Sequence, residues 1–281
     1  MDKAESNSPP DIREEIEKPS AADRLSSSAV PRYRIKGDGP LLVYVAGLDG
    51  TGEMLFKQAP ELSRSYRVVT YRSRDSGRFT YEDLADDVAA IIENTRERRA
   101  TIVAESFGGG VALTFALRHP SLIERLALVN TFSRFRQRVK IHLAARLASI
   151  VPFSLLCYAR NKGNAIGLLV DNITGEDRER FFDIISTVER EGYARRLQLI
   201  SELDLDDRLS EIEAPTLIIA GEKDLLIRSV REARLMAARM PNATVKVVKG
   251  AGHACLLGSR VNLARILADW SFATVSKAMP Q

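Results

Sequence analysis

A serine lies in the tightest turn that the sequence predicts, between a buried strand and a helix. The segment Ala104-Glu105-Ser106-Phe107-Gly108 has small residues two positions before and two positions after this serine. Such a turn leaves no room for larger side chains there, and it presents the serine hydroxyl above the sheet. The pattern predicts a nucleophile elbow with Ser106 as the nucleophile. A glycine-rich turn with an incidental serine is the alternative.

A serine hydroxyl needs a base to remove its proton, and the chain has three histidines. His119 lies at the end of a predicted helix, where capping is the more ordinary role. His142 falls inside a helical block, where a surface position is more ordinary. His253 follows a strand predicted at 244–248, at the carboxyl edge of the sheet that also carries Ser106. Because sites in open α/β folds form at that edge, we expect His253 to be the base.

A histidine base needs a carboxylate that fixes its tautomer. Asp224 follows an apolar strand predicted at 215–220, again at the carboxyl edge, and we expect it to be that carboxylate. Glu222 is the local rival, although a surface position suits it better. The other strand end where such folds place an acid carries Asn130, which has no carboxylate. The order serine, acid, histidine along the chain is typical of an α/β-hydrolase triad.

The negative charge of a tetrahedral intermediate needs backbone donors in an oxyanion hole. Phe107 directly follows the serine, and its N–H is one expected donor. The second should come from the glycine-rich loop 46–52, where we expect the Leu48 N–H, with that of Asp49 next. The loop lacks the GK[ST] ending and the GxGxxG spacing of nucleotide-binding loops. The expected chemistry requires no metal and no organic cofactor.

These residues depend on strands and helices that alternate from about residue 41. Short apolar runs predict strands at 41–46, 67–71, 101–104, 126–129, 215–220 and 244–248. Periodic segments predict helices at about 53–64, 80–98, 107–118, 229–240 and 259–276, with Thr80 as an N-cap. Continuous apolar strands that alternate with helices are typical of a mostly parallel, doubly wound sheet covered on both faces.

A block without strand signals separates the two halves of this α/β core. Residues 133–208 look helical and are too long for an ordinary connection, so we expect a helical cap inserted between core segments 31–132 and 209–281. The first part of the cap, 133–162, carries seven Lys or Arg and no Asp or Glu. Its apolar residues recur at helical spacing. The segment therefore predicts either a helix packed on the core or a peripheral contact with an anionic membrane.

The overall composition is that of an ordinary globular chain. Its 281 residues include 41 Lys+Arg and 37 Asp+Glu, and the net charge of +4 is too small to predict nucleic-acid binding. Residues 1–30 are mostly polar and show no apolar period, so we expect a disordered tail that is not a signal peptide. Two cysteines exclude a disulfide scaffold, and no apolar run reaches the roughly 18 residues of a membrane span. We expect a cytoplasmic protein.

Over residues 31–281 the chain resembles the serine hydrolases of the α/β-hydrolase superfamily, on the basis of the elbow, Asp224 and His253. A narrower resemblance is to the hydrolase region of plant phytyl ester synthases and diacylglycerol acyltransferases. It rests on Ala46-Gly47-Leu48-Asp49-Gly50-Thr51-Gly52, Gly221-Glu222-Lys223-Asp224, Met240-Pro241-Asn242-Ala243-Thr244-Val245 and Gly252-His253-Ala254-Cys255-Leu256-Leu257. This narrower family implies acyl transfer to or from lipid alcohols. Its members carry a second, acyltransferase-like region after the hydrolase domain, whereas this sequence stops soon after the final predicted helix. We therefore expect the activity of the hydrolase half rather than synthase activity.

Together the residues predict a serine hydrolase that cleaves a small-molecule carboxylic ester or thioester through an acyl-enzyme. A mainly apolar cap favours a medium or long acyl chain. A lipid acyltransferase is one alternative, and a non-catalytic binding protein of the same fold is another. No residue is assigned to substrate binding from the sequence.

Overall fold

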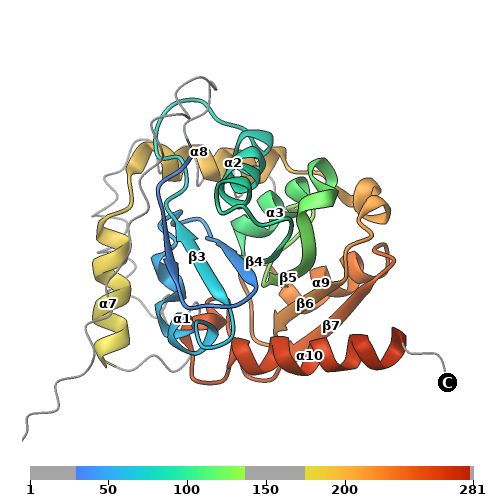
Figure 1. Ribbon diagram of the computed structural model, residues 1–281. Coiled ribbons are helices and arrows are strands. Elements are labelled where there is room, and N and C mark those ends of the chain that lie inside the picture. Colours follow the sequence, from blue (N-terminus) through green and yellow to red (C-terminus); the bar gives the residue numbers. More distant parts are fainter. Residues whose placement is uncertain (1–29, 137–174, 279–281) are drawn as a thin grey trace, which may run out of the picture.

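The computed structural model describes residues 30–136 and 175–278, which build a seven-stranded sheet with helices on both faces (Figure 1). The strand order is β1-β3-β2-β4-β5-β6-β7, with β1 antiparallel to β3 and the other neighbours parallel. The strands are β1 Tyr33–Lys36, β2 Leu41–Val45, β3 Arg67–Tyr71, β4 Ala100–Glu105, β5 Ile123–Val129, β6 Thr216–Gly221 and β7 Ala243–Val248. The predicted α/β class with a mostly parallel sheet is confirmed.

The helices connect these strands and cover the sheet. They are η1 Glu53–Lys57, α1 Ala59–Leu62, α2 Tyr81–Asn94, α3 Phe107–Arg118, η2 Pro120–Leu122, α7 Gly175–Ser186, α8 Arg190–Glu202, η3 Asp206–Glu211, α9 Ser229–Ala237, η4 Cys255–Leu257 and α10 Leu263–Ala278.

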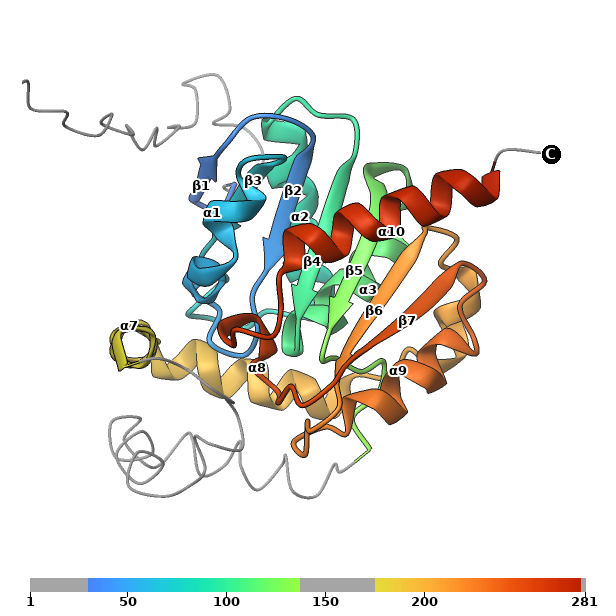
Figure 2. The same ribbon diagram turned by 90° about the horizontal axis from the view of Figure 1, so that it is seen from below.

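Alternate residues of the central strands enter one of two hydrophobic cores. Val43 and Ala104 face the core that α2, α3 and α9 close, whereas Leu42 and Val103 face the core beneath α1 and α10. Helix α10 crosses this second face of the sheet (Figure 2). Because both faces are buried, the central strands are continuously apolar, which is why the sequence revealed them.

The strand that sequence reasoning missed is β1. It has four residues, lies at the sheet edge and alternates between buried Tyr33 and exposed Arg34. It pairs with β3 in antiparallel register, Tyr33 opposite Tyr71 and Lys36 opposite Val68. A short edge strand with charged residues has no apolar run, so the pattern used for the other six strands does not detect it.

Three predicted helices were wrong in their extent. The one expected at 53–64 is two short pieces, η1 and α1, with Pro60 in the first turn of α1. Helix α2 starts after the predicted cap Thr80, whose side chain accepts from the Asp83 N–H at 3.2 Å, but it ends at Asn94 rather than 98. The final helix starts at Leu263, four residues later than expected.

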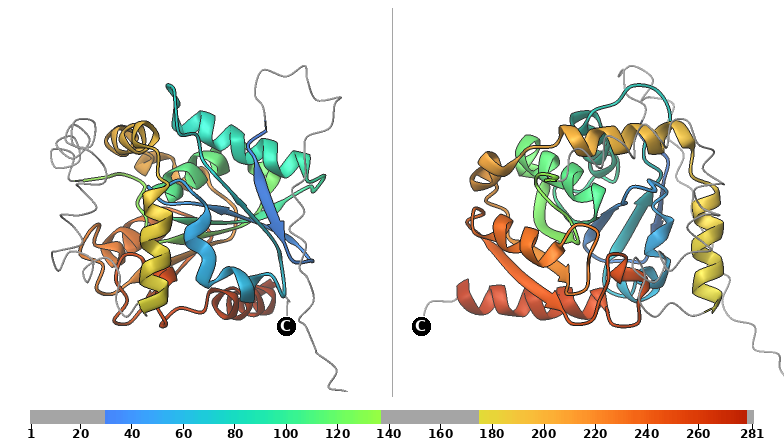
Figure 3. Two further views of the ribbon diagram at one scale, coloured as in Figure 1. Left: turned by 90° about the vertical axis from the view of Figure 1, so that its left-hand side faces the viewer. Right: turned by 180° about the vertical axis from the view of Figure 1, so that it is seen from behind.

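Only the ends of the predicted cap are described. Helix α8 lies across the carboxyl edge of the sheet (Figure 2), and α7 stands at one side of the core (Figure 3), where Phe181 packs on Met54. Residues 137–174, with His142 and most of the basic segment 133–162, lie outside the described residues, as does the tail 1–29. The membrane contact, the tail and the division into core and cap therefore stay predictions. Within 30–136 and 175–278, no helix has the length and hydrophobicity of a membrane span.

Candidate active site

The turn at Ser106 has the geometry that its sequence predicted. Ser106 joins β4 to α3 with φ 53° and ψ −118°, a conformation that costs a non-glycine residue about 1–3 kcal/mol. Its N–H donates to the Val129 carbonyl at 2.9 Å, and its carbonyl accepts from the Gly109 N–H at 3.0 Å. A Cβ on Gly108 would lie 2.4 Å from the carbonyl oxygens of Val45 and Ala46, so only glycine fits there.

The structure brings the three predicted polar residues together. His253 Nε2 lies 3.0 Å from Ser106 Oγ, and His253 Nδ1 lies 2.8 Å from Asp224 Oδ2. The serine follows β4, the aspartate follows β6 and the histidine follows β7, so all three come from the carboxyl ends of parallel strands. His253 is 8% exposed and Asp224 3% exposed. The three side chains form one hydrogen-bonded series, and their roles as nucleophile, base and orienting carboxylate stay a prediction.

Asp224 is held by donors besides the histidine. Its Oδ1 accepts from the Leu226 N–H at 2.9 Å and the Ile227 N–H at 3.3 Å, and the Ser229 hydroxyl donates to Oδ2. Burial acts to raise the pKa of Asp224, but the hydrogen bonds and the nearby His253 outweigh it, so the pKa lies below its ordinary value. Asp224 is therefore an anion at neutral pH.

The rival candidates lie elsewhere. Glu222 is exposed, and its Oε2 accepts from the Gly250 N–H at 2.9 Å. His119 Nε2 lies 2.7 Å from Asp86 Oδ1, at the far end of α3 from Ser106. Neither side chain belongs to the hydrogen-bonded series at Ser106.

Asn130 has a structural role at the site that sequence reasoning missed. Its Oδ1 accepts from the Gly221 N–H at 2.7 Å, and its Nδ2 donates to the carbonyl oxygens of Gly252 at 3.1 Å and His253 at 2.5 Å. Asn130 is 1% exposed and has φ 45°. It ties the ends of β5 and β6 to the histidine loop. The available signal was a polar side chain directly after a buried strand. The sequence analysis considered Asn130 only as a possible acid, and it has no carboxylate.

The backbone N–H groups of Leu48 and Phe107 are the two donors that the sequence predicted for an oxyanion hole. Among the described residues, neither the Leu48 N–H nor the Phe107 N–H donates a hydrogen bond to the protein. The loop of Leu48 lies beside Ser106, since a Cβ on Gly47 would be 3.6 Å from Ser106 Cβ. The Asp49 side chain folds back, with Oδ1 accepting from the Thr51 N–H at 2.8 Å. The role of these donors in an oxyanion hole stays a prediction.

A second carboxyl group, Glu105, is buried directly before Ser106. The Tyr44 hydroxyl donates a hydrogen bond to Glu105 Oε2, with an O–O distance of 2.8 Å. Burial raises the pKa of Glu105 to about 7, although the Tyr44 hydrogen bond and the charge of His253 act to lower it. Burial also raises the pKa of the neighbouring Cys255 thiol, which keeps that group neutral. The sequence analysis assigned no role to Glu105.

Metal ligation finds no support within residues 30–136 and 175–278. These residues contain no group of three or more His, Cys, Asp or Glu side chains placed to hold a metal ion.

A mostly parallel sheet, a strand–turn–helix elbow with serine at its tip, and Asp and His after later strands together define an α/β-hydrolase fold. The chain belongs to the alpha/beta hydrolase family, whose family model matches residues 42–266.

Comparisons with individual proteins agree with this family. The chain is 28% identical over 227 residues to a putative carbamate hydrolase RutD of Caulobacter sp. strain K31, covering 77% of this chain and 84% of that protein. It superposes on a hydrolase from Pseudomonas aeruginosa PA01 with a TM-score of 0.74 and 26% identity, covering 86% and 93% of the two chains. It superposes on the enol-lactonase from Burkholderia xenovorans LB400 with a TM-score of 0.69 and 25% identity, covering 88% and 96%.

The predicted membership in the α/β-hydrolase family is thereby confirmed. These matches do not show the narrower resemblance to plant phytyl ester synthases, since the relatives are named as carbamate hydrolases and the solved structures as a hydrolase and a lactonase.

Proposed function

We propose that this chain is a serine hydrolase that cleaves a carboxylic ester through an acyl-enzyme. The observation that carries the proposal is the hydrogen-bonded series from the half-buried Ser106 Oγ through the buried imidazole of His253 to the buried Asp224, with distances of 3.0 and 2.8 Å. Family membership and hydrolases among the structural neighbours support the class of reaction.

Each step of the mechanism has a residue in reach. The Nδ1–H of His253 donates a hydrogen bond to the Asp224 carboxylate. This tautomer leaves the Nε2 lone pair facing Ser106. As Ser106 Oγ bonds to the ester carbonyl carbon, its proton moves to His253 Nε2 and the carbonyl π electrons move onto the oxygen. The N–H groups of Leu48 and Phe107 stabilise this oxyanion.

Collapse of the tetrahedral intermediate breaks the bond to the leaving alkoxide, which takes the proton from His253 and departs as the alcohol. Water then gives a proton to His253 and attacks the acyl-enzyme. The second intermediate releases the carboxylic acid and returns the proton to Ser106 Oγ. Asp224 stays ionised throughout and stabilises the imidazolium in both halves of the reaction.

The proposal also covers the acyl part of the substrate. The cap expected at 133–208 is mainly apolar, which favours a medium or long acyl chain; much of that segment lies outside the described residues. A carbamate is the second candidate, because the Caulobacter relative is named a putative carbamate hydrolase. The same nucleophile, base and donors would act on a carbamate carbonyl. Nitrogen conjugation makes that carbonyl less electrophilic, so oxyanion stabilisation would matter more.

The test combines active-site labelling with a substrate panel. A fluorophosphonate probe should label the wild type and a Ser121→Ala control, an exposed serine on η2, but not Ser106→Ala. p-Nitrophenyl esters of increasing chain length, measured beside a p-nitrophenyl carbamate, rank the two substrate classes. Added alcohol acceptor separates hydrolysis from the acyl transfer that the plant-family resemblance implies.

Label that persists on Ser106→Ala would remove Ser106 as the nucleophile. If the wild type is not labelled and hydrolyses no substrate, the result would favour a non-catalytic binding protein. Faster turnover of the carbamate than of every ester would replace the ester proposal by the carbamate one.

A further inference from the structure

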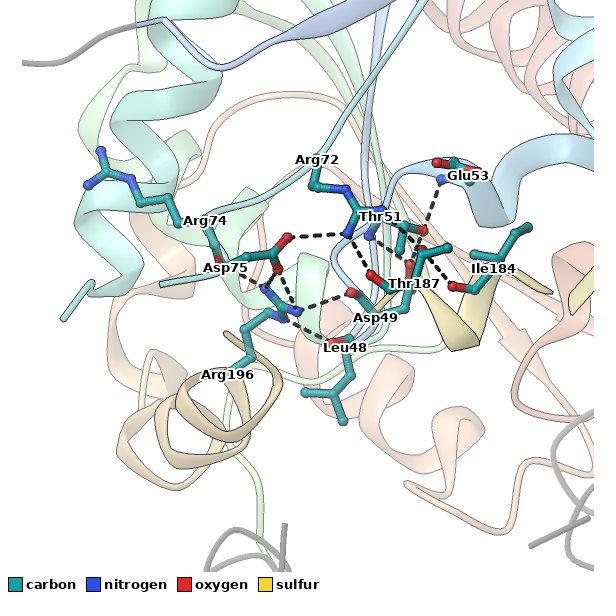
Figure 4. A network of polar contacts seen from close by, with 10 residues as sticks. All are labelled: Leu48, Asp49, Thr51, Glu53, Arg72, Arg74, Asp75, Ile184, Thr187 and Arg196. Atoms are coloured by element: carbon teal, nitrogen blue, oxygen red, sulfur yellow. Dashed lines mark hydrogen bonds and ion pairs between the residues drawn. The ribbon is translucent and has the colours of Figure 1, made fainter. Parts of the chain in front are cut away.

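Arg196 of helix α8 is a fully buried cation at the loop that carries Leu48 (Figure 4). Its Nε donates to the Leu48 carbonyl at 2.9 Å, its Nη2 to the Asp49 carbonyl at 3.0 Å and its Nη1 to the Arg74 carbonyl at 2.9 Å. The two terminal nitrogens also contact Asp75 Oδ1 at 3.3 and 3.4 Å. These contacts supply an acceptor for each of the five N–H bonds of the guanidinium.

Such a group is costly to bury and needs every donor satisfied. Burial lowers the pKa of Arg196 and the Asp75 carboxylate opposes this, but an arginine keeps its charge at neutral pH. Asp75 is also fixed from the other side, since its Oδ2 accepts from Arg72 at 3.2 Å. Arg72 in turn donates to the carbonyl and the hydroxyl of Thr187, at 3.2 and 3.1 Å, just after α7. The cation is thus held in one position relative to the loop.

The hydrogen bonds of Arg196 continue through the loop to the proposed oxyanion donor. The Asp49 carbonyl, which accepts from Arg196, belongs to the same peptide unit as the Gly50 N–H. This N–H donates to the Gly47 carbonyl at 3.1 Å. The Gly47 carbonyl shares its peptide unit with the Leu48 N–H. Two peptide dipoles therefore connect the cation to the Leu48 N–H, and hydrogen bonds in such a chain polarise one another.

The backbone is adapted to this cation. Gly50 has φ 69°, and a Cβ there would lie 2.6 Å from Arg196 Cζ. On α8 itself, a Cβ on Gly192 would lie 2.6 Å from Asp75 Cα. Glycine at both positions allows the helix and its guanidinium to approach the two loops closely.

We propose that Arg196 is a positioning residue for the oxyanion hole, which clamps the carbonyl groups on both sides of Asp49 and polarises the Leu48 N–H. It touches no reacting atom and acts through the peptide units between Gly47 and Gly50. Helix α8 is then part of the catalytic apparatus as well as a cover over it. This inference rests on the proposed function.

The experiment compares Arg196→Met and Arg196→Lys with Arg195→Met. Arg195 is the matched control because it lies on the same helix and donates to the Phe79 carbonyl at 2.8 Å, away from the Leu48 loop. For each protein, kcat and KM are measured on one ester, together with Ki for a trifluoromethyl ketone. The hemiketal that Ser106 forms with this ketone places an oxyanion in the hole, whereas KM reports binding of the neutral ester.

Complete loss of an oxyanion donor costs about 10² to 10³ in kcat, so a displaced and less polarised donor should cost about 10- to 100-fold in Arg196→Met. The Ki for the ketone should rise by the same factor while KM changes little. Arg196→Lys, which keeps the charge but not the fork of donors, should be intermediate, and Arg195→Met should match the wild type. If Arg196→Met fails to fold, the parallel change of kcat and Ki in Arg196→Lys decides.

Unchanged kcat and Ki in a folded Arg196 variant with a lower melting temperature would overturn the proposal, because Arg196 would then only fasten α8 to the core. Failure of the proposed function looks different: the wild type itself would show no Ser106-dependent hydrolysis and no ketone inhibition.

Discussion

The buried carboxyl of Glu105 should make the stability of this protein fall as the pH rises toward neutrality. Burial raises its folded-state pKa from 4.5 to about 7, since the ionised form would lie among Tyr44 and the apolar residues beneath α10. The unfolded chain leaves the same carboxyl in water. The folded state therefore binds this proton more tightly, and protonated Glu105 favours folding.

The magnitude follows from the two pKa values. A difference of about 2.5 pKa units corresponds to about 3 kcal/mol at 1.36 kcal/mol per unit. Because the folded pKa is the raised one, this contribution is fully present below pH 4.5 and is lost as the pH rises through about 7. Glu105→Gln removes the titrating group but keeps an oxygen that can accept from Tyr44. Between pH 4.5 and pH 8, the free energy of unfolding of the variant should therefore rise by about 3 kcal/mol relative to that of the wild type.

Urea unfolding at pH 5, 6, 7 and 8, followed by circular dichroism, measures this difference. Other groups titrate in both proteins, so subtracting the two profiles isolates Glu105, and any cost of the amide appears as a constant offset. Glu222→Gln, which removes an exposed carboxylate near the same sheet edge, is the control. A difference between wild type and Glu105→Gln that stays constant over this pH range would refute the reasoning.

Three further perturbations test other parts of the site. Asp224→Asn should lower kcat/KM on a p-nitrophenyl ester by about 10³- to 10⁴-fold with an unchanged circular dichroism spectrum, because the amide does not stabilise the imidazolium; near-wild-type turnover would contradict its role. Gly108→Ala would place a Cβ 2.4 Å from two carbonyl oxygens, so it should lower the free energy of unfolding in urea by about 3 kcal/mol. Gly77→Ala is the control, because a Cβ there meets no atom within 4 Å and only the left-handed backbone preference of glycine is lost. Asn130→Ala removes the hydrogen-bond partner of the Gly221 N–H and of the His253 carbonyl, so it should lower the free energy of unfolding by about 1–3 kcal/mol and also lower kcat. An unchanged kcat would show that the loop holds His253 without Asn130.

The features that could be predicted from sequence are those dictated by local constraints. Continuous apolar runs fit strands buried on both faces, and six of the seven strands were predicted within a few residues. At the elbow, the strand–turn–helix pattern predicted a small residue at Gly108, although the carbonyl oxygens that exclude a Cβ there belong to Val45 and Ala46 at the end of β2. The placement of Ser106, Asp224 and His253 at one edge of the sheet followed from the rule that parallel strands end there.

Tertiary structure alone decided the contacts that join distant segments. Asn130 meets His253 across 123 positions of the chain, and Arg196 meets Leu48 across 148, so neither pairing leaves a periodic or local signal. The pKa of Glu105 depends on what packs around it, which no residue type specifies. Residue types and their spacing thus determined the class of chemistry and the residues proposed to perform it. The packing of helix α8 and of the strand ends determined how the loop around Leu48 and the histidine are held, because those positions depend on burial and on hydrogen bonds between remote parts of the chain.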